Sequence, residues 1–354
     1  MNKREFLKAG LVAGLATQLP FAASAAPVNK HKKIKNWVWV NPNLKDTDTD
    51  LETRYTNFKA AGITGIFFEN DSERHFRTAK KHGLEAHRWM WTMNRAELIT
   101  VNPEWYAHNR NGDSCADKPP YVNYYRWLCP SRPEVKEYLQ NQVDLILSKD
   151  YVDGIHLDYV RYCDVILPVN LWQNYHIEQT KELPEYDYCY CDICRANFKV
   201  QYGADLSDIQ FPEASLSWRL FRYRNITNIV NGISAVAKQH SKSITAAVFP
   251  TPEIARRNVR QDWTNWKLDG VCPMTYHGFY KEKPSWIGDA VAKGVHFLAG
   301  DFPLYAGLYL PDFKSDDELR EGISAALKNG ASGVSFFGNV TDGVLAILKS
   351  ELKA

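Results

Sequence analysis

The stretch "VDGIHLDYV" (residues 152–160) has the pattern of a strand in a parallel sheet. Side chains alternate along a strand, so His156 and Asp158 point to one face while Ile155 and Leu157 point to the other. The apolar pair suits a layer of covering helices, which places the polar pair inside a closed sheet. Asp158 then stands at the carboxyl end of the strand, where barrel enzymes hold their reactive groups.

Seven further runs of β-branched and aromatic residues alternate with longer amphipathic segments along the chain. This alternation is typical of βα units around a parallel sheet, and eight such strands close a barrel. We therefore expect a single-domain (β/α)8 TIM barrel, a fold for which 354 residues is within the usual range. The predicted strands span residues 36–42, 63–70, 84–94, 152–160, 243–250, 268–277, 303–312 and 331–339.

The seventh strand and the loop after the fourth are the least regular parts of this pattern. "VHFLAG" (295–300) is an alternative to 303–312 for the seventh strand. The choice decides whether Asp301 or Asp312 reaches the active face. The interval 161–242 is long for a simple crossover, so we expect an elaborated loop after the fourth strand.

The first residues have the composition of an export signal. Residues 1–26 combine a basic start, a short apolar run and small residues before a potential cleavage site, which leaves 27–354 for the barrel. "KREFLK" is similar to a twin-arginine motif with Lys3 in place of the first arginine, so both Tat and Sec export stay open. No other segment is apolar for long enough to span a bilayer. We expect a periplasmic or extracellular protein.

Composition favours a neutral, hydroxyl-rich partner. The formal net charge of +2 gives no basis for binding nucleic acid or an anionic membrane. The chain has 11 Trp and 19 Tyr, and aromatic side chains with polar tips suit carbohydrates. Filling a large core is the alternative use for these residues.

The second informative stretch, "EYDYCYCDICRANF", places three cysteines within six residues. Neighbouring cysteines bridge one another poorly, whereas this spacing lets several sulfurs converge on one ion. A fourth ligand is needed for a tetrahedral zinc, and Cys129 before a predicted helix is our choice over Cys163 and Cys115. Disulfides among the seven cysteines are the alternative.

"CYCDICRANF" together with the upstream "CPSRPEV" resembles the zinc-binding cluster of family 42 β-galactosidases and related glycoside-hydrolase-like barrels. The resemblance implies a structural zinc held by Cys129, Cys189, Cys191 and Cys194. The catalytic pair of those enzymes does not carry over, because their fourth strand ends in Asn-Glu and this one ends in Leu157-Asp158.

"DGIHLDYVRY" (153–162) resembles the fourth strand of the family 10-like glycosyl hydrolase barrels and, more distantly, the DGxDxDxE strand of family 18 chitinases. Val160 stands where the chitinase acid would fall, which argues against substrate-assisted chitinase chemistry. The resemblance implies glycoside hydrolysis, with Asp158 as nucleophile or general base. An ion pair of Asp158 with Arg161 or His156 at the rim is the structural alternative.

Glycoside hydrolysis requires a second carboxyl group. Glu69 follows directly from the second predicted strand and is our first choice as proton donor, with Asp312 after the seventh strand as its replacement. If Glu69 instead forms a salt bridge with Arg88, Asp312 takes the role. Predicted substrate-binding residues share a position near the barrel mouth and are Trp39, Trp91, His156, Arg161, Tyr276 and His277.

The sequence therefore predicts an exported glycoside hydrolase acting on an oligo- or polysaccharide. Export fits this function, since large glycans must be cut outside the cytoplasm. Two other functions stay open. One is a carbohydrate-binding barrel without catalysis. The other is a metal-dependent hydrolase of another bond, with His156, Asp158 and His277 holding a labile metal.

Overall fold

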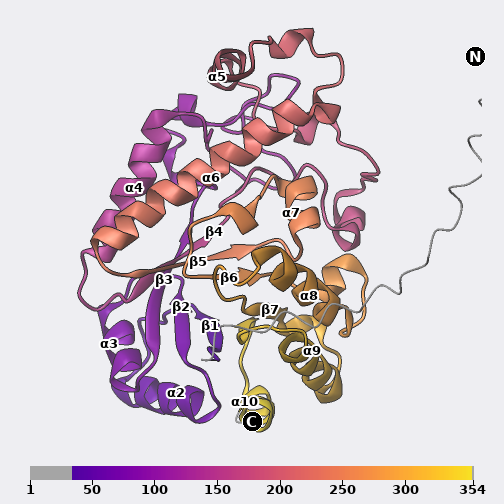
Figure 1. Cartoon of the computed structure of the whole chain (residues 1–354). Coiled ribbons are helices and arrows are strands. Elements are labelled where there is room, and N and C mark those ends of the chain that lie inside the picture. Colours follow the sequence, from indigo (N-terminus) through magenta and orange to yellow (C-terminus); the bar gives the residue numbers. More distant parts are fainter. Residues whose placement is uncertain (1–33, 353–354) are drawn as a thin grey trace, which may run out of the picture.

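A computed structural model describes residues 34–352, so the predicted signal at 1–26 lies outside the described residues. Eight parallel strands form one sheet in the order β6-β5-β4-β3-β2-β1-β8-β7 (Figure 1). The predicted (β/α)8 architecture is confirmed. The strands are β1 (Trp37–Val40), β2 (Gly65–Phe68), β3 (Glu85–Trp91), β4 (Gly154–Asp158), β5 (Ser243–Val248), β6 (Gly270–Pro273), β7 (Ala306–Tyr309) and β8 (Val334–Phe337).

The sheet closes between β6 and β7, the two strands at its ends. These two strands are joined by isolated bridges, whereas the other neighbouring strands form continuous ladders of hydrogen bonds. Isolated parallel bridges join Val271 to Leu304 and Met274 to Gly307. The backbone N–H of Tyr305 also donates to the carbonyl of Val271 at 2.8 Å. The seventh strand thus lies within the predicted range 303–312.

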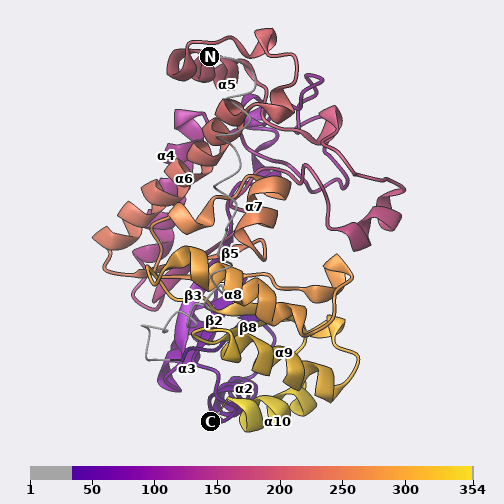
Figure 2. The same cartoon turned by 45° about the vertical axis from the view of Figure 1, so that its right-hand side comes forward.

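Helices surround the barrel and connect its strands (Figures 1 and 2). Residues 295–298, from the alternative seventh strand, belong to the last turn of α8. No helix among residues 34–352 combines the length and apolar character needed to cross a bilayer. The helices are α2 (Asp48–Ala60), α3 (Glu73–Lys81), α4 (Pro133–Leu147), α5 (Asp192–Tyr202), α6 (Leu216–Gln239), α7 (Pro252–Val259), α8 (Trp286–Leu298), α9 (Asp316–Lys328) and α10 (Asp342–Glu351).

Local sequence explains where several of these helices begin. Thr47 caps α2 in a capping box, because its hydroxyl accepts from the N–H of Asp50 while the Asp50 carboxylate accepts from the N–H of Thr47. Ser315 caps α9 in the same position, and three acidic residues follow it in the first turn, where they favour the helix dipole.

The strands separate two apolar regions, as their alternation requires. Inside the barrel, β1 contributes Trp37 and Trp39, and these pack with Phe67 of β2 and Trp89 of β3. The outward side chains, such as Leu157 of β4, join the much larger core beneath the helices. Aromatic rings therefore pack together in the barrel interior.

The connection from β4 to α6 is the most elaborate of the barrel, as predicted. It contains α5 and projects beyond the end of the barrel, while α6 returns alongside α4 (Figures 1 and 2). A fully buried ion pair between Asp187 and Arg222 of α6 anchors this excursion, with Arg260 3.6 Å from the same carboxylate oxygen. The loop is thus fixed to two elements of the barrel wall.

A charged cluster closes the opposite, amino-terminal end of the barrel and gives a prediction about acid stability. Burial alone would raise the pKa of Glu85, but interactions with His87 and with Lys35, 2.6 Å away, outweigh it and hold the pKa at about 2. Because the pKa of Glu85 is lower in the folded protein than its ordinary value of 4.5, the ionised carboxylate stabilises the fold at every pH above 4.5. This stabilisation is lost as the pH falls from 4.5 towards 2.

We therefore expect wild-type protein to lose stability over that pH window, and Glu85→Gln protein to lose less of it. Urea unfolding followed by circular dichroism at a series of pH values measures the difference. Glu73→Gln is the matched control, since its ion pair with Arg77 is exposed and contributes little. Equal pH dependence of wild-type and Glu85→Gln protein would contradict the assignment.

Candidate active site

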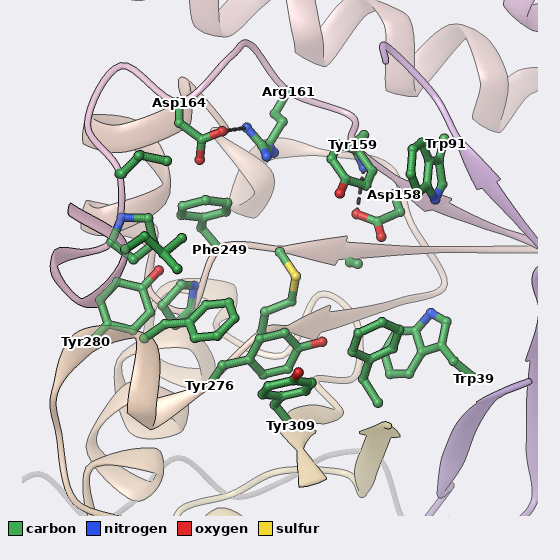
Figure 3. A pocket seen from close by; sticks show the side chains of 18 of the residues that line it. Trp39, Trp91, Asp158, Tyr159, Arg161, Asp164, Phe249, Tyr276, Tyr280 and Tyr309 are labelled. Carbon is green, nitrogen blue, oxygen red and sulfur yellow. Dashed lines mark hydrogen bonds and ion pairs between the residues drawn. The ribbon is translucent and has the colours of Figure 1, made fainter. Parts of the chain in front are cut away.

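A cavity of about 260 Å³ opens at the carboxyl ends of the strands, where TIM barrels place their chemistry (Figure 3). Its wall is mostly aromatic, and it draws on strands β1, β3, β4, β5, β7 and β8 and on the loops after β3, β4, β5 and β6. The size and apolar lining suit a sugar ring rather than an extended charged group. Among the described residues, its carboxylates are Asp158 and Asp164.

Asp158 ends β4 and faces this cavity (Figure 3). One carboxylate oxygen accepts from the indole N–H of Trp89 at 3.1 Å, and the other accepts from the backbone N–H of Tyr159 at 2.6 Å. Burial raises the pKa of Asp158, although these hydrogen bonds and the charge of Arg161 oppose the shift. A carboxyl group in such surroundings keeps a proton to higher pH than an ordinary aspartate.

Arg161 and Asp164 form a second charged element of the cavity wall, drawn in Figure 3. Arg161 Nη1 lies 2.8 Å from Asp164 Oδ2, and both side chains are almost fully buried. The guanidinium also stacks on Trp127, 4.6 Å from its centroid, and on Phe249 at 5.2 Å. This packing holds the ion pair in one position beside the cavity.

Trp39, Trp91 and Tyr276, which the sequence predicted as substrate-binding, all line the cavity together with Tyr309. Figure 3 shows Tyr276 and Tyr309 across the cavity from Asp158. Burial raises the pKa of Tyr276 well above its ordinary value, so its hydroxyl stays protonated and able to donate. Aromatic faces and hydroxyl tips around one carboxyl group are the elements of a sugar site.

Residues 74–293 match the family model described as glycosyl hydrolase-like 10. The chain belongs to this family. The match covers more than half of the chain and includes both Asp158 and the cysteine cluster. None of the curated proteins matches the sequence.

Solved structures support the same fold for this glycosyl hydrolase-like 10 member. The glycoside hydrolase domain of PgaB (BpsB) from Bordetella bronchiseptica is 12% identical, with 89% of this chain and 98% of that chain covered and a TM-score of 0.66. The β-galactosidase from the psychrophilic Marinomonas ef1 is 11% identical, with a TM-score of 0.63. The match covers 90% of this chain and 59% of that chain. The catalytic domain of β-amylase from Paenibacillus polymyxa is 11% identical, with 90% and 98% covered and a TM-score of 0.60. At these identities the likeness concerns the fold alone.

The structure does not bring Glu69 into the cavity with Asp158. Glu69 follows β2 but lines a second hollow of about 540 Å³, which also contains Arg88. Trp89 and Trp91 belong to the walls of both hollows. The strand leads into Glu69 as predicted, yet the two carboxyl groups lie in different hollows.

Asp312 also lies outside the cavity wall. Its carboxylate accepts from the backbone N–H of Gly278 at 3.0 Å, and a Cβ on Gly278 would stand only 2.6 Å from that carboxylate. Asp312 therefore braces the loop after β6. His277, buried beside it, packs against Phe313 with ring centroids 4.9 Å apart and does not line the cavity.

His156 points into the barrel as alternation required, but it lies too deep to reach the cavity. Its ring is fully buried, stacks on Phe67 at 3.7 Å and shares a hydrogen bond with Thr245 at 2.8 Å. Asp164 is the residue that sequence reasoning missed. Its position three residues after Arg161, in a stretch with no strand or helix periodicity, was the available signal.

The four cysteines predicted as metal ligands come together in one buried cluster at the base of the β4–α6 excursion. Their sulfurs all lie within 4.8 Å of one another, and Cys129 is 3.5 Å from both Cys191 and Cys194. Cys129 precedes α4 while the other three lie at the start of α5, so a shared ion would join these segments. The seven cysteines are all free thiols in the structure.

Proposed function

We propose that this protein is an exported glycoside hydrolase that cleaves a neutral or modestly substituted carbohydrate, with Asp158 as a catalytic residue. The observation that carries the proposal is a partly buried carboxyl group with a raised pKa in the wall of an aromatic, sugar-sized cavity. Membership of a hydrolase-like family supports the reaction class. The composition of residues 1–26 supports export.

In the proposed reaction Asp158 is the proton donor to the glycosidic oxygen. This differs from the role suggested by the sequence, in which Asp158 was the nucleophile or base and Glu69 the donor. The raised pKa of Asp158 favours the donor role, because general acids in glycosidases carry raised pKa values. Trp89 holds the carboxyl group in place through its indole N–H.

We assign the second carboxyl group to Asp164, which would take the proton from an attacking water. It is the other carboxylate of the same cavity, and Arg161 fixes its position. Glu69 and Asp312 are the weaker candidates because each lies outside the cavity wall. Tyr276 and Tyr309 would orient the sugar through their hydroxyl groups.

The positions of the candidate metal ligands at the barrel mouth do not favour the metal-dependent alternative. That mechanism needs His156, Asp158 and His277 around one ion with an open position. His156 is stacked deep in the barrel, and His277 packs against Phe313. Among the described residues, the group of side chains able to hold a metal is the cysteine cluster.

We propose that this cluster holds a structural zinc. Four thiolates at the usual zinc–sulfur distance of about 2.3 Å have sulfurs about 3.8 Å apart, and the 3.5 Å separations from Cys129 are close to that value. The backbone N–H of His108 also donates to Cys189 Sγ at 3.4 Å. Four sulfur ligands complete the coordination shell, so the metal would brace the β4–α6 excursion and take no part in hydrolysis.

A screen of reducing ends released from a panel of glycans tests the function. The full-length protein is expected to release sugars from at least one glycan, and Asp158→Asn protein is expected to release them about 10²- to 10⁴-fold more slowly. Sugar binding without release by the wild-type protein would instead indicate a carbohydrate-binding barrel.

A further inference from the structure

Aromatic rings continue beyond the cavity onto the surface of the β3 and β4 loops. Trp91, in the cavity wall, contacts Tyr124 at 6.2 Å between ring centroids and Tyr159 at 4.6 Å. Tyr124 then contacts Tyr125 at 5.2 Å, and Tyr125 also belongs to the cavity wall. The cavity is therefore continuous with a surface strip made of Trp91, Tyr124 and Tyr125.

Tyr121 supports this strip from behind. It stacks on Tyr186 at 4.3 Å and contacts Tyr175 at 5.5 Å, while its hydroxyl donates to the carbonyl of Asp164 at 2.7 Å. These contacts join the 121–125 loop to the segment that carries the Arg161–Asp164 ion pair. The loop is thus held in register with the proposed catalytic groups.

Tyr124 is the exposed member of the strip, with half of its surface open to solvent. It also lines the second hollow, whose wall includes the cavity residues Trp89 and Trp91. That hollow carries polar groups suited to hydroxyls. They include Asn94, which is almost fully buried and whose amide Nδ2 has no hydrogen-bond partner among the described residues.

We propose that the strip and the second hollow bind further sugar units of an extended glycan chain, so that the enzyme cleaves polysaccharides internally. The strip is continuous with the cavity, and exposed aromatic faces between the cavity and the second hollow, with its polar groups, fit a chain of sugar rings. Internal cleavage rests on the proposed hydrolase function, whereas binding of the glycan chain is independent of it.

Affinity electrophoresis tests the binding. Full-length Asp158→Asn protein, which leaves the polymer intact, is run in native gels containing hydroxyethyl cellulose, glycol chitin, laminarin or galactomannan. Retardation in at least one gel is expected, with Tyr124→Ala in the same background weakening the apparent binding roughly three- to tenfold. Phe211→Ala is the matched control, because Phe211 is an exposed ring on the loop between α5 and α6.

Each outcome separates this inference from the proposed function. No retardation in any gel, or equal retardation with and without Tyr124, overturns the extended site even if short substrates are cleaved. Retardation that depends on Tyr124, without release of reducing ends by the wild-type protein, keeps the extended site and overturns the hydrolase. If both activities are present, an early fall in viscosity is expected for wild-type protein and a slower one for Tyr124→Ala protein.

Discussion

Asp158→Asn protein is expected to turn over its glycan about 10²- to 10⁴-fold more slowly than wild-type protein, the range that a positioned proton donor contributes. The amide oxygen of asparagine can still accept from one of the two donors, Trp89 or Tyr159, and the amide group has nearly the size and shape of the carboxyl group, so the fold and the cavity are expected to persist. Initial rates of reducing-end release measure the loss, and thermal unfolding checks the fold. Asp150→Asn is the matched control, because Asp150 is an exposed carboxylate paired with Arg77.

The pH profile tests the role of Asp158 as well as its importance. A proton donor works only while protonated, so the wild-type rate falls as the pH rises through the pKa of Asp158. Because burial raises that pKa above 3.8, the falling limb is expected at a higher pH than for an ordinary aspartate, and it is absent from the residual activity of Asp158→Asn protein. Full activity of Asp158→Asn protein would remove Asp158 from the mechanism. Loss of activity in both Asp158→Asn and Glu69→Gln proteins, with Asp164→Asn protein unaffected, would instead restore the pairing of Asp158 with Glu69 that the sequence suggested.

The barrel was predictable because its signals are periodic. Eight apolar runs coincide with the eight strands, and alternation along β4 correctly sent Leu157 to the helices and His156 inwards. Position along the barrel axis is less evident in a sequence. His156 lies only two residues before Asp158, yet that step places it in the packed interior, below the cavity.

Alternation along a strand does not predict where the side chains just beyond its end point. Glu69 follows β2 by one residue, but alternation no longer constrains it there, and it faces the hollow shared with Arg88. Asp164 and Tyr124 belong to loops without periodicity, and their places depend on contacts made across the fold, such as the ion pair with Arg161. Strand ends identify the mouth of a barrel, whereas tertiary packing of the loops selects which groups meet there.

The cysteines were an exception to this limit, because metal ligands carry their own spacing signal. Cys129 is 60 residues from Cys189 along the chain, yet its place before a predicted helix indicates it as the fourth ligand. Cys163 and Cys115, the alternative fourth ligands, are buried outside the cluster.

Removing one cysteine of this cluster is expected to destabilise the protein far more than removing a buried cysteine elsewhere. Structural zinc sites contribute on the order of 10 kcal/mol of apparent binding free energy, whereas most single substitutions cost about 0.5–3 kcal/mol. Cys194→Ala protein is therefore expected to lose its metal and melt at a much lower temperature. Cys272→Ala, on β6, is the matched control. Metal content by mass spectrometry and thermal unfolding give the comparison.

The loss is also expected to reach the cavity, because a hydrogen-bonded path connects the two sites. Cys194 Sγ lies 3.1 Å from Ser131 Oγ, and Asn225 joins that hydroxyl to the hydroxyl of Tyr162 at 2.8 Å and 3.2 Å. Arg161, in the cavity wall, donates to the backbone carbonyl of Tyr162 at 3.0 Å. Turnover is expected to fall with metal content, and to return when zinc is restored to chelated wild-type protein.

Disulfide formation is the outcome that would contradict a metal-braced loop. Its signature is an unchanged melting temperature after chelation, together with cysteines that resist alkylation until a reductant is added. A zinc site gives the reverse pattern, since chelation frees thiolates that alkylate at once and lowers the melting temperature. The two cases also differ in geometry. A disulfide brings two sulfurs to about 2.05 Å, while a zinc ion keeps its four sulfurs about 3.8 Å apart. The 3.5 Å separations of Cys129 from Cys191 and Cys194 are closer to the second case.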